Sequence, residues 1–196
     1  MTIKYPELYN FTKLTSPIAE NEWLPFEKSL VYIEQAKGTI LSSPDQIPEY
    51  LYFVLSGIVR IYYQDANGRE FTKFFCGPHQ IIGAYAELLQ NEKTRSYIQV
   101  VSDAKIFQFS FKEYQNMVKQ YNSWKDFGRI IAEQNYVMKE RREYMLLQLS
   151  SEECYQMFID DFKNIMDDLP QYQIASYLGM TPEGFNRFLK KRNSNS

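Results

Sequence analysis

The chain has very few of the residues that build metal and thiol chemistry. Its 196 residues include two cysteines, Cys76 and Cys154, and a single histidine, His79. Two thiols are too few for a four-cysteine iron–sulfur cluster or a disulfide framework, so each is expected to be a small buried hydrophobe, with a redox-switched pair as the alternative. His79 follows a Gly-Pro pair, where a solvated or capping imidazole is expected rather than a haem ligand.

Long apolar runs and a strong net charge are also missing. No stretch approaches the roughly 20 apolar residues of a transmembrane helix, and the N-terminus lacks the apolar segment of a signal peptide. We therefore expect a cytoplasmic protein that does not use a membrane as its partner. A net charge of −2 argues against general coating of nucleic acid, although a sequence-reading protein needs only a local basic surface.

The motifs of common enzymes are absent as well. The sequence has no Gly-rich phosphate loop, no GxSxG and no HExxH, and its lone histidine leaves no second imidazole for base or ligand duties. The adjacent pairs Asp160-Asp161 and Asp167-Asp168 point in different directions on a helix, which indicates a solvated face. We predict that the protein is not an enzyme and holds no metal.

What the chain does have is a helix-turn-helix pattern near its end. A first helix can start at Pro170, and Gly179 supplies the positive φ of a tight turn. Thr181 then caps a second helix in which Pro182 occupies the first position. The apolar stripe of this second helix comprises Phe185, Phe188 and Leu189.

The other faces of the second helix carry side chains suited to base edges and phosphates. The predicted DNA-binding residues are Thr181, Glu183, Asn186, Arg187, Lys190 and Lys191. The basic charge is local, because the preceding segment 152–168 is strongly acidic. An ordinary helical hairpin that closes a domain is the alternative to a DNA-binding element.

The middle of the chain predicts an antiparallel β-roll. Two helical segments, at 5–14 and ending near Tyr32, precede it. Ser56-Gly57 and Asp65-Ala66-Asn67-Gly68 are expected to be hairpin turns between consecutive strands. The β-prone runs are residues 39–41, 50–55, 58–63, 71–75, 80–82, 97–101 and 105–109.

A short helix at 111–120 and a long one at 123–148 follow. The long helix carries a seam with coiled-coil spacing, in which the expected dimer contacts are Phe127, Ile131, Gln134, Met138, Arg141 and Met145. The alternative is that this seam packs on the β-roll, but Ile130 and Val137 offer a second apolar flank for that purpose. The expected domains are 1–122 (sensory), 123–148 (dimerisation) and 149–196 (DNA-binding), in an α+β chain.

This order of elements, with several motifs, resembles the Crp/Fnr family of bacterial transcription regulators. The motifs are Lys37-Gly38-Thr39, the segment 52–60, Asn67-Gly68-Arg69-Glu70, Ile82-Gly83 and Arg95-Ser96. The segments 151–155 and 168–192 are especially similar to members common in Bacteroidetes. The resemblance implies a double-stranded β-helix like that of cyclic-nucleotide-binding domains, a homodimer, a palindromic double-stranded DNA operator and RNA polymerase as partners. It also implies a wing after the helix-turn-helix, which we expect to be truncated or absent.

In that family the main base-contacting positions fall on Pro182, Glu183 and Arg187 of this chain. Glu183 is expected to accept from a cytosine amino group and Arg187 to pair with guanine, whereas Pro182 has lost its contact.

The same resemblance implies an effector site around a phosphate-binding cassette. Its candidate residues are Gly83, Glu87, Arg95, Ser96, Lys139 and Glu140. Ala84 stands where the ribose-binding glutamate of cyclic-AMP-binding members belongs, and alanine cannot accept a hydrogen bond. The alternatives are therefore cyclic AMP, another small ligand, or no ligand at all.

Taken together, the sequence predicts a sequence-specific DNA-binding regulator that is a homodimer. The competing hypothesis is a cyclic-nucleotide-binding module whose helical C-terminus docks a protein partner. That alternative would not require Arg187 and Lys190-Lys191 beside Glu183 and Asn186.

Overall fold

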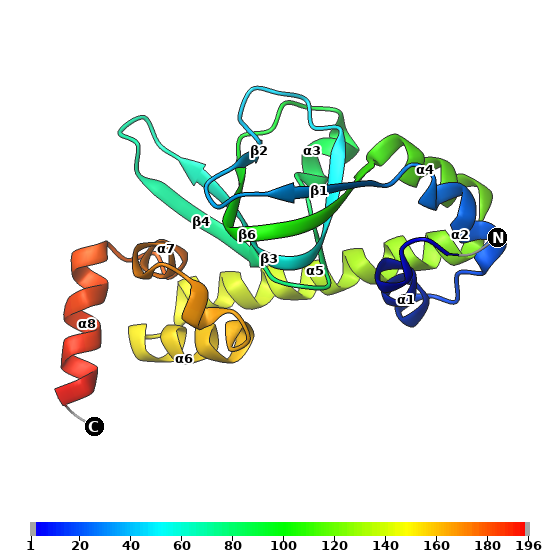
Figure 1. The fold of residues 1–196 in the computed structure, drawn as a ribbon. Helices are drawn as coiled ribbons and strands as arrows, with labels where there is room; N and C mark the ends of the chain where they lie inside the picture. Colours follow the sequence, from blue (N-terminus) through cyan, green and yellow to red (C-terminus); the bar gives the residue numbers. More distant parts are fainter. Residues whose placement is uncertain (1–2, 195–196) are drawn as a thin grey trace.

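The structure is a computed structural model and describes residues 3–194 (Figure 1). Two helices and a β-roll come first: α1 (Pro6–Thr15), α2 (Glu20–Glu27), β1 (Val31–Gln35), β2 (Ile40–Ser42), β3 (Tyr50–Gln64), β4 (Glu70–Cys76), β5 (Gln80–Ile82), α3 (Tyr85–Gln90) and β6 (Tyr97–Ser110). Helices follow: α4 (Phe111–Gln120), α5 (Asn122–Gln148), α6 (Ser151–Phe162), the short 3₁₀ helix η1 (Met166–Asp168), α7 (Gln171–Tyr177) and α8 (Pro182–Ser194).

Two long antiparallel strands, β3 and β6, form the centre of the roll. Their first and second halves belong to different layers. One layer has the order β1, the end of β6, the start of β3, then β5, and the other has β2, the start of β6, the end of β3, then β4. The predicted α+β class and antiparallel roll are therefore confirmed.

Gly57 is the point at which β3 changes layer. The sequence predicted a hairpin turn at Ser56-Gly57, but the strand continues through it, and the pairing with β6 only shifts register there. Gly57 has φ +85°, and a Cβ at this position would lie 2.4 Å from the carbonyl oxygen of Asp103 and 2.8 Å from the Cβ of Ala104. The glycine is needed for a bend with close strand contact rather than for a turn.

The second predicted turn is confirmed. The backbone N–H of Gly68 donates to the carbonyl of Asp65, and Gly68 has φ +81°. One boundary is wrong: the second helix ends at Glu27, and Tyr32 already lies in β1. Val31–Gln35 pairs with the end of β6. This pairing with a distant strand makes the segment a strand, although its local sequence is compatible with either helix or strand.

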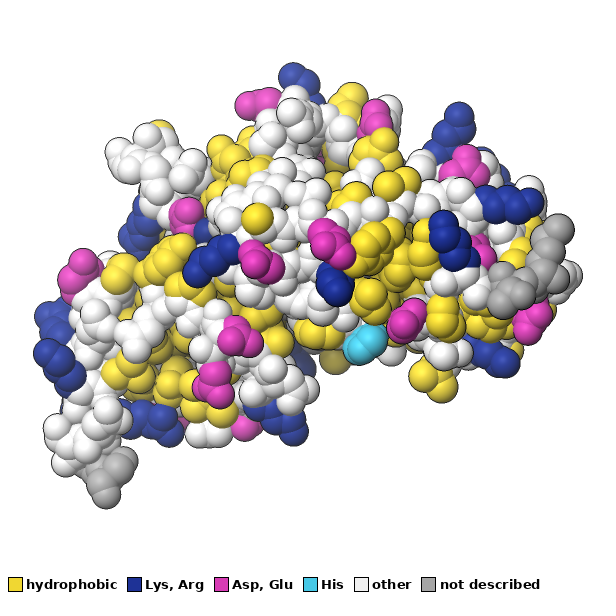
Figure 2. All heavy atoms as spheres, viewed as in Figure 1, with side chains coloured by type: hydrophobic (Ala, Val, Ile, Leu, Met, Phe, Trp, Pro, Cys, Tyr) yellow, Lys and Arg dark blue, Asp and Glu magenta, His cyan; other side chains and the backbone are white. Residues whose placement is uncertain are grey.

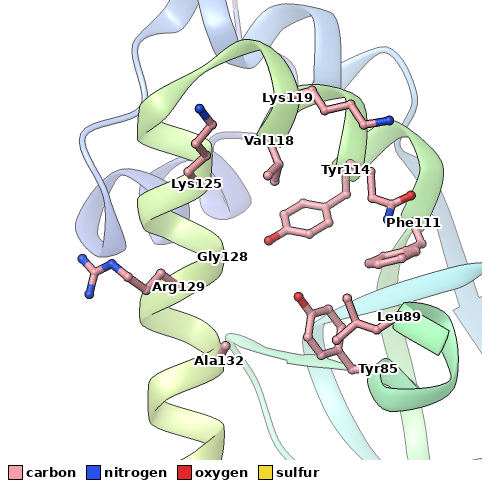
Figure 3. A pocket seen from close by; sticks show the side chains of 11 residues that line it. Tyr85, Leu89, Phe111, Tyr114, Val118, Lys119, Lys125, Gly128, Arg129 and Ala132 are labelled. Carbon is pink, nitrogen blue, oxygen red and sulfur yellow. The ribbon is translucent and has the colours of Figure 1, made fainter.

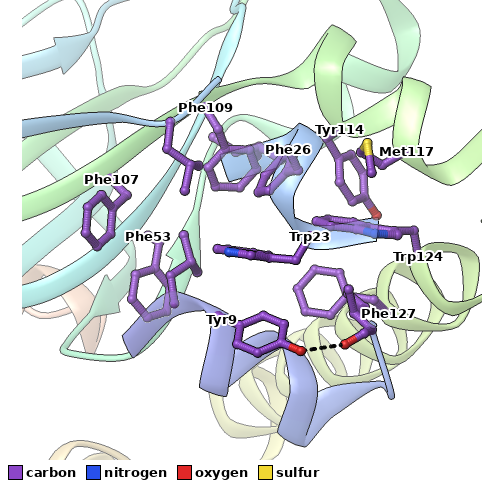
Figure 4. Packing of buried hydrophobic residues seen from close by; sticks show 14 of the residues in the cluster. Tyr9, Trp23, Phe26, Phe53, Phe107, Phe109, Tyr114, Met117, Trp124 and Phe127 are labelled. Atoms are coloured by element: carbon purple, nitrogen blue, oxygen red, sulfur yellow. Dashed lines mark hydrogen bonds between the residues drawn. The ribbon is translucent and has the colours of Figure 1, made fainter. Parts of the chain in front are cut away.

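Alternation along the strands divides their apolar side chains among three cores. Those that point between the two layers form the inner core, for example Val54, Val59 and Ile106. Those on the outer face of the first layer join α1, α2, α4 and the start of α5 in an aromatic core, where Phe53 and Phe109 meet Trp23 and Trp124 (Figure 4). Burial of this much aromatic surface fixes α5 along the roll.

A third core joins the outer face of the second layer to the C-terminal helices. Ile58, Phe75 and Val101 of the roll pack with α6, α7 and α8, and Phe158 at the centre is fully buried. We call this set the shared core. The C-terminal helices therefore pack directly against the roll at β4.

Both cysteines are buried and unpaired, as predicted. Cys76 belongs to the inner core, where burial raises the pKa of its thiol, and Cys154 belongs to the shared core. Within residues 3–194, no group of acidic, histidine or cysteine side chains is arranged to hold a metal ion. None of the described helices is long and apolar enough to cross a membrane.

Candidate nucleic-acid interface and effector region

Helices α7 and α8 form the predicted helix-turn-helix. Gly179, in the turn between them, has φ +71°, and Thr181 caps α8 by accepting a hydrogen bond from the backbone N–H of Gly184 at 3.0 Å. Pro182 is the first residue of α8. Pro170 caps α7 instead of starting it, a difference of one residue.

The faces of α8 separate as predicted. Phe185 is buried and contacts Tyr155 of α6, while Phe188 and Leu189 are half-buried against the shared core. The predicted DNA-binding side chains are all exposed: Thr181, Glu183, Asn186, Arg187, Lys190 and Lys191. The apolar stripe anchors α8 and leaves its polar face to solvent.

The basic end of α8 is exposed and largely unneutralised. Figure 2 shows Lys and Arg side chains gathered along the left edge of the molecule, where Figure 1 places α8. Arg192 pairs with Glu152 of α6 at 2.8 Å and lies over the Tyr155 ring, so it fastens α8 to α6. In the described part of the chain, no carboxylate lies within ion-pair distance of Arg187, Lys190 or Lys191.

A polar bridge, not predicted from the sequence, fastens α7 to β4. The hydroxyl of Ser176 accepts from the backbone N–H of Thr72 and donates to the carbonyl of Glu70, both at 2.8 Å. Arg142 of α5 donates to the carbonyls of Thr72 and Tyr177, both at 2.9 Å, and lies 3.8 Å from the centre of the Tyr177 ring. We call these contacts the α7–β4 bridge. It fixes the orientation of the helix-turn-helix relative to the roll.

A buried ion pair lies beside this bridge. The guanidinium of Arg60 is 2.6 Å from the carboxylate of Glu70, and its other N–H groups donate to Gln99 and Thr72. The Arg60 side chain is only 1% exposed, whereas that of Glu70 is 26% exposed. The sequence feature that could have indicated this pair is an arginine between Val59 and Ile61 of an apolar strand, because a buried charge requires a partner of opposite charge.

The six predicted effector residues lie in two regions, the segment from β5 to β6 and the long helix α5. Arg95 is exposed, and no carboxylate among residues 3–194 pairs with it. The Ser96 hydroxyl is buried and shares a hydrogen bond with the hydroxyl of Thr94 at 3.1 Å. Glu87 is buried in α3, while Lys139 and Glu140 are exposed on α5.

Gly83 and Ala84 are tightly packed. A Cβ on Gly83 would lie 2.4 Å from a methyl group of Leu51, so this glycine permits close packing of the chain on itself. Ala84 is 3% exposed and offers no acceptor for a ribose hydroxyl.

The proposed dimer helix divides into a buried and an exposed part. Phe127 and Met145 are 4% and 1% exposed, and they pack in the aromatic and shared cores. This corrects the sequence-based assignment at those two positions, because side chains buried within one chain cannot contact a second. Arg141 pairs with Asp161 of α6 at 3.0 Å, whereas Gln134 and Met138 remain exposed and Ile131 is half-buried.

Comparison with known proteins agrees with this geometry. Residues 33–121 match the model of the cyclic nucleotide-binding domain family. A putative transcriptional regulator of the Crp/Fnr family from Eubacterium rectale superposes with a TM-score of 0.74 and 15% identity, over 95% of this chain and 88% of that one. The chain has the Crp/Fnr fold.

Other solved structures share the Crp/Fnr fold with this chain. FixK2 from Bradyrhizobium japonicum has a TM-score of 0.72 at 17% identity, over 85% of each chain. CLP from Xanthomonas campestris, described as a c-di-GMP-responsive global regulator, has a TM-score of 0.70 at 18% identity, over 90% of this chain and 93% of that one. No curated protein sequence matches this chain. The likeness to Bacteroidetes members rests on the sequence segments alone.

Proposed function

We propose that the protein is a sequence-specific DNA-binding transcription regulator of the Crp/Fnr type that acts as a homodimer. The observation that carries this proposal is the exposed face of α8, which presents Glu183, Asn186 and Arg187 together with two lysines. A recognition helix needs this combination: an apolar stripe toward its own domain, and base-reading and phosphate-binding side chains on the outside.

The side chains of α8 divide into two roles. Arg187 can donate two hydrogen bonds to a guanine, and Glu183 can accept one from a cytosine amino group. Lys190 and Lys191, one turn further on, suit phosphates, which they bind as point charges without reading the sequence. The distribution places sequence readers near the start of α8 and phosphate binders near its end.

An exposed apolar strip on α5 supports the homodimer. Val137, Tyr144 and Leu147 are 56%, 57% and 69% exposed. A hollow of about 630 Å³ lies beside residues 131–138 of α5, which include Val137, and is also lined by Phe11, Phe74, His79 and Ile81. A second copy of α5 would cover this strip, and twofold symmetry would present two copies of α8 to a palindromic operator.

The effector region supports regulation without cyclic AMP. Ala84 cannot accept a hydrogen bond from a ribose hydroxyl, and the Ser96 hydroxyl is already bonded to that of Thr94. The proposal therefore includes an effector other than cyclic AMP, or none.

Selection from random duplex DNA by the purified protein, with and without cyclic AMP, tests this function. We expect one palindromic sequence to be enriched equally in both conditions. Arg187→Ala should relax one base position in each half-site at a cost of roughly 1–3 kcal/mol. Lys191→Ala should weaken binding to all sequences alike and reduce the slope of affinity against salt by about 1.

Lys112→Ala is the matched control, because Lys112 is an exposed lysine on α4, far in sequence from α8, and should leave binding unchanged. Identical behaviour of the Arg187 and Lys191 variants across all sequences would contradict the assignment of Arg187 as a base reader. Enrichment only with cyclic AMP would overturn the argument from Ala84. Failure to enrich any sequence would favour docking of a protein partner by the C-terminal helices.

A further inference from the structure

A second hollow opens between α3, α4 and α5, on a part of the molecule that the proposed function does not use. Its volume is about 390 Å³, within the range of roughly 300–1,000 Å³ that small-molecule pockets occupy. None of the six predicted effector residues lines it. Figure 3 shows the rings of Tyr85 and Tyr114 facing the side of α5 that carries Gly128 and Ala132.

The floor of this hollow is aromatic. Tyr85, Phe111 and Tyr114 line it, and the Tyr85 and Phe111 rings meet edge to face with centroids 5.9 Å apart. Burial raises the pKa of both the Tyr85 and the Tyr114 phenol, so both remain neutral at physiological pH. Leu89 at the edge is 60% exposed, which leaves apolar surface for a ligand to cover.

The hollow exists because α5 carries small residues where it passes the floor. Gly128 and Ala132 lie one turn apart and both line the space. A Cβ on Gly128 would lie 2.1 Å from the hydroxyl oxygen of Tyr114. Since glycine inside a helix costs about 1 kcal/mol relative to alanine, this approach of Tyr114 explains its presence.

The rim of the hollow is cationic. Lys119 of α4 and Lys125 and Arg129 of α5 are among the residues that line the hollow, although Figure 3 shows Arg129 extending to the other side of α5. Arg129 is neutralised by Glu133 at 2.9 Å and Asp126 at 3.5 Å. Among residues 3–194, no carboxylate lies within ion-pair distance of Lys119 or Lys125. Two uncompensated lysines thus stand above an apolar aromatic floor.

We propose that this hollow binds a small organic anion with an aromatic or apolar body, such as an aryl carboxylate. The body stacks on Phe111 and the tyrosine rings and covers Leu89. The carboxylate lies at the rim, beside the lysines that line the hollow, where a bond to an ammonium group is charge-assisted. The inference concerns binding only and does not depend on whether α8 reads DNA.

Three probes with the same phenyl-propyl body and different charge test this site: 3-phenylpropionate, 3-phenylpropanol and 3-phenylpropylamine. Ligand-observed NMR titration of the full chain should give a dissociation constant of about 1 mM or tighter for the acid. The alcohol should bind several-fold more weakly and the amine at least about tenfold more weakly, because the lysines repel it.

Single-residue variants test whether the probes bind in this hollow. Lys119→Glu should weaken binding of the acid at least about tenfold and strengthen that of the amine, while Lys112→Glu, on the same helix but outside the hollow, should change neither. Ala132→Phe should fill the space and abolish binding of all three probes. Ala132 is exposed, so this variant should keep the thermal midpoint of the parent protein.

The fluorescence of Trp124 reports independently whether the acid binds in this hollow. Its ring contacts Tyr114 with centroids 6.4 Å apart, so the acid should alter tryptophan emission, which the phenyl probes do not absorb. Two results would overturn the proposal: no saturable binding of the acid up to 10 times the expected constant of about 1 mM, or equal binding by the parent and Ala132→Phe proteins.

Discussion

Phe158→Ala is expected to lower the free energy of unfolding by about 3–5 kcal/mol, the usual cost of removing a fully buried aromatic ring. Phe158 is 0% exposed and lies at the centre of the shared core. Its ring contacts Phe75 of the roll, Phe162 of α6 and Tyr177 of α7, with centroids 6.3, 5.1 and 5.4 Å apart. The cavity would loosen three elements at once, as urea unfolding followed by circular dichroism should show.

Phe71→Ala is the matched control for this prediction. Phe71 lies on β4, the strand that carries Phe75, but its side chain is 38% exposed and its ring contacts Arg69. Its loss should cost no more than about 1 kcal/mol, since more than a third of its surface already faces water. Equal destabilisation by the two variants would show that Phe158 does not occupy the shared core described above.

Glu70→Leu is expected to lower the free energy of unfolding by roughly 3 kcal/mol, although Glu70 is partly exposed. The cost arises at Arg60, whose 1% exposed guanidinium would lose its only carboxylate partner among the described residues. Gln99 and Thr72 would still accept its hydrogen bonds but carry no charge.

A double variant separates this charge effect from a simple loss of packing. Arg60→Met/Glu70→Leu should be more stable than Glu70→Leu alone, because replacement of a whole buried pair by apolar groups is often tolerated. Glu34→Leu, at an exposed position of β1, controls for the general effect of a surface leucine. If the double variant were the less stable of the two, the desolvated charge would not be the cause.

Local signals predicted much of the fold. The α4 boundaries at 111 and 120 follow from the sequence, and α5 begins only one residue earlier than expected. The cap at Thr181 and the turn at Gly179 were predicted correctly, since capping and positive φ depend on residues close together in the chain.

The errors concern choices between distant partners. An apolar stripe predicts that a helix packs against other residues, but it does not say whether these belong to the same chain or to a second copy. Phe127 and Met145 were therefore assigned to a dimer interface, although they lie in internal cores. Ser176 and Thr72 are 104 residues apart, and no local pattern announces their hydrogen bond. Gly57 was predicted to lie in a turn, but its positive φ occurs at a bend within a strand. Glycine is favoured at both kinds of position, so the residue type alone does not distinguish them.

The α7–β4 bridge and the shared core have a consequence for the autonomy of the parts. The sequence predicted a domain boundary near residue 149. The packing nevertheless continues across it, because Ile58, Phe75 and Val101 of the roll pack against the C-terminal helices. A fragment that ends with α5 would uncover this apolar surface and leave Thr72 and Glu70 without their Ser176 bonds. The roll and the C-terminal helices therefore form one cooperative unit, in which the stability of each part depends on the other.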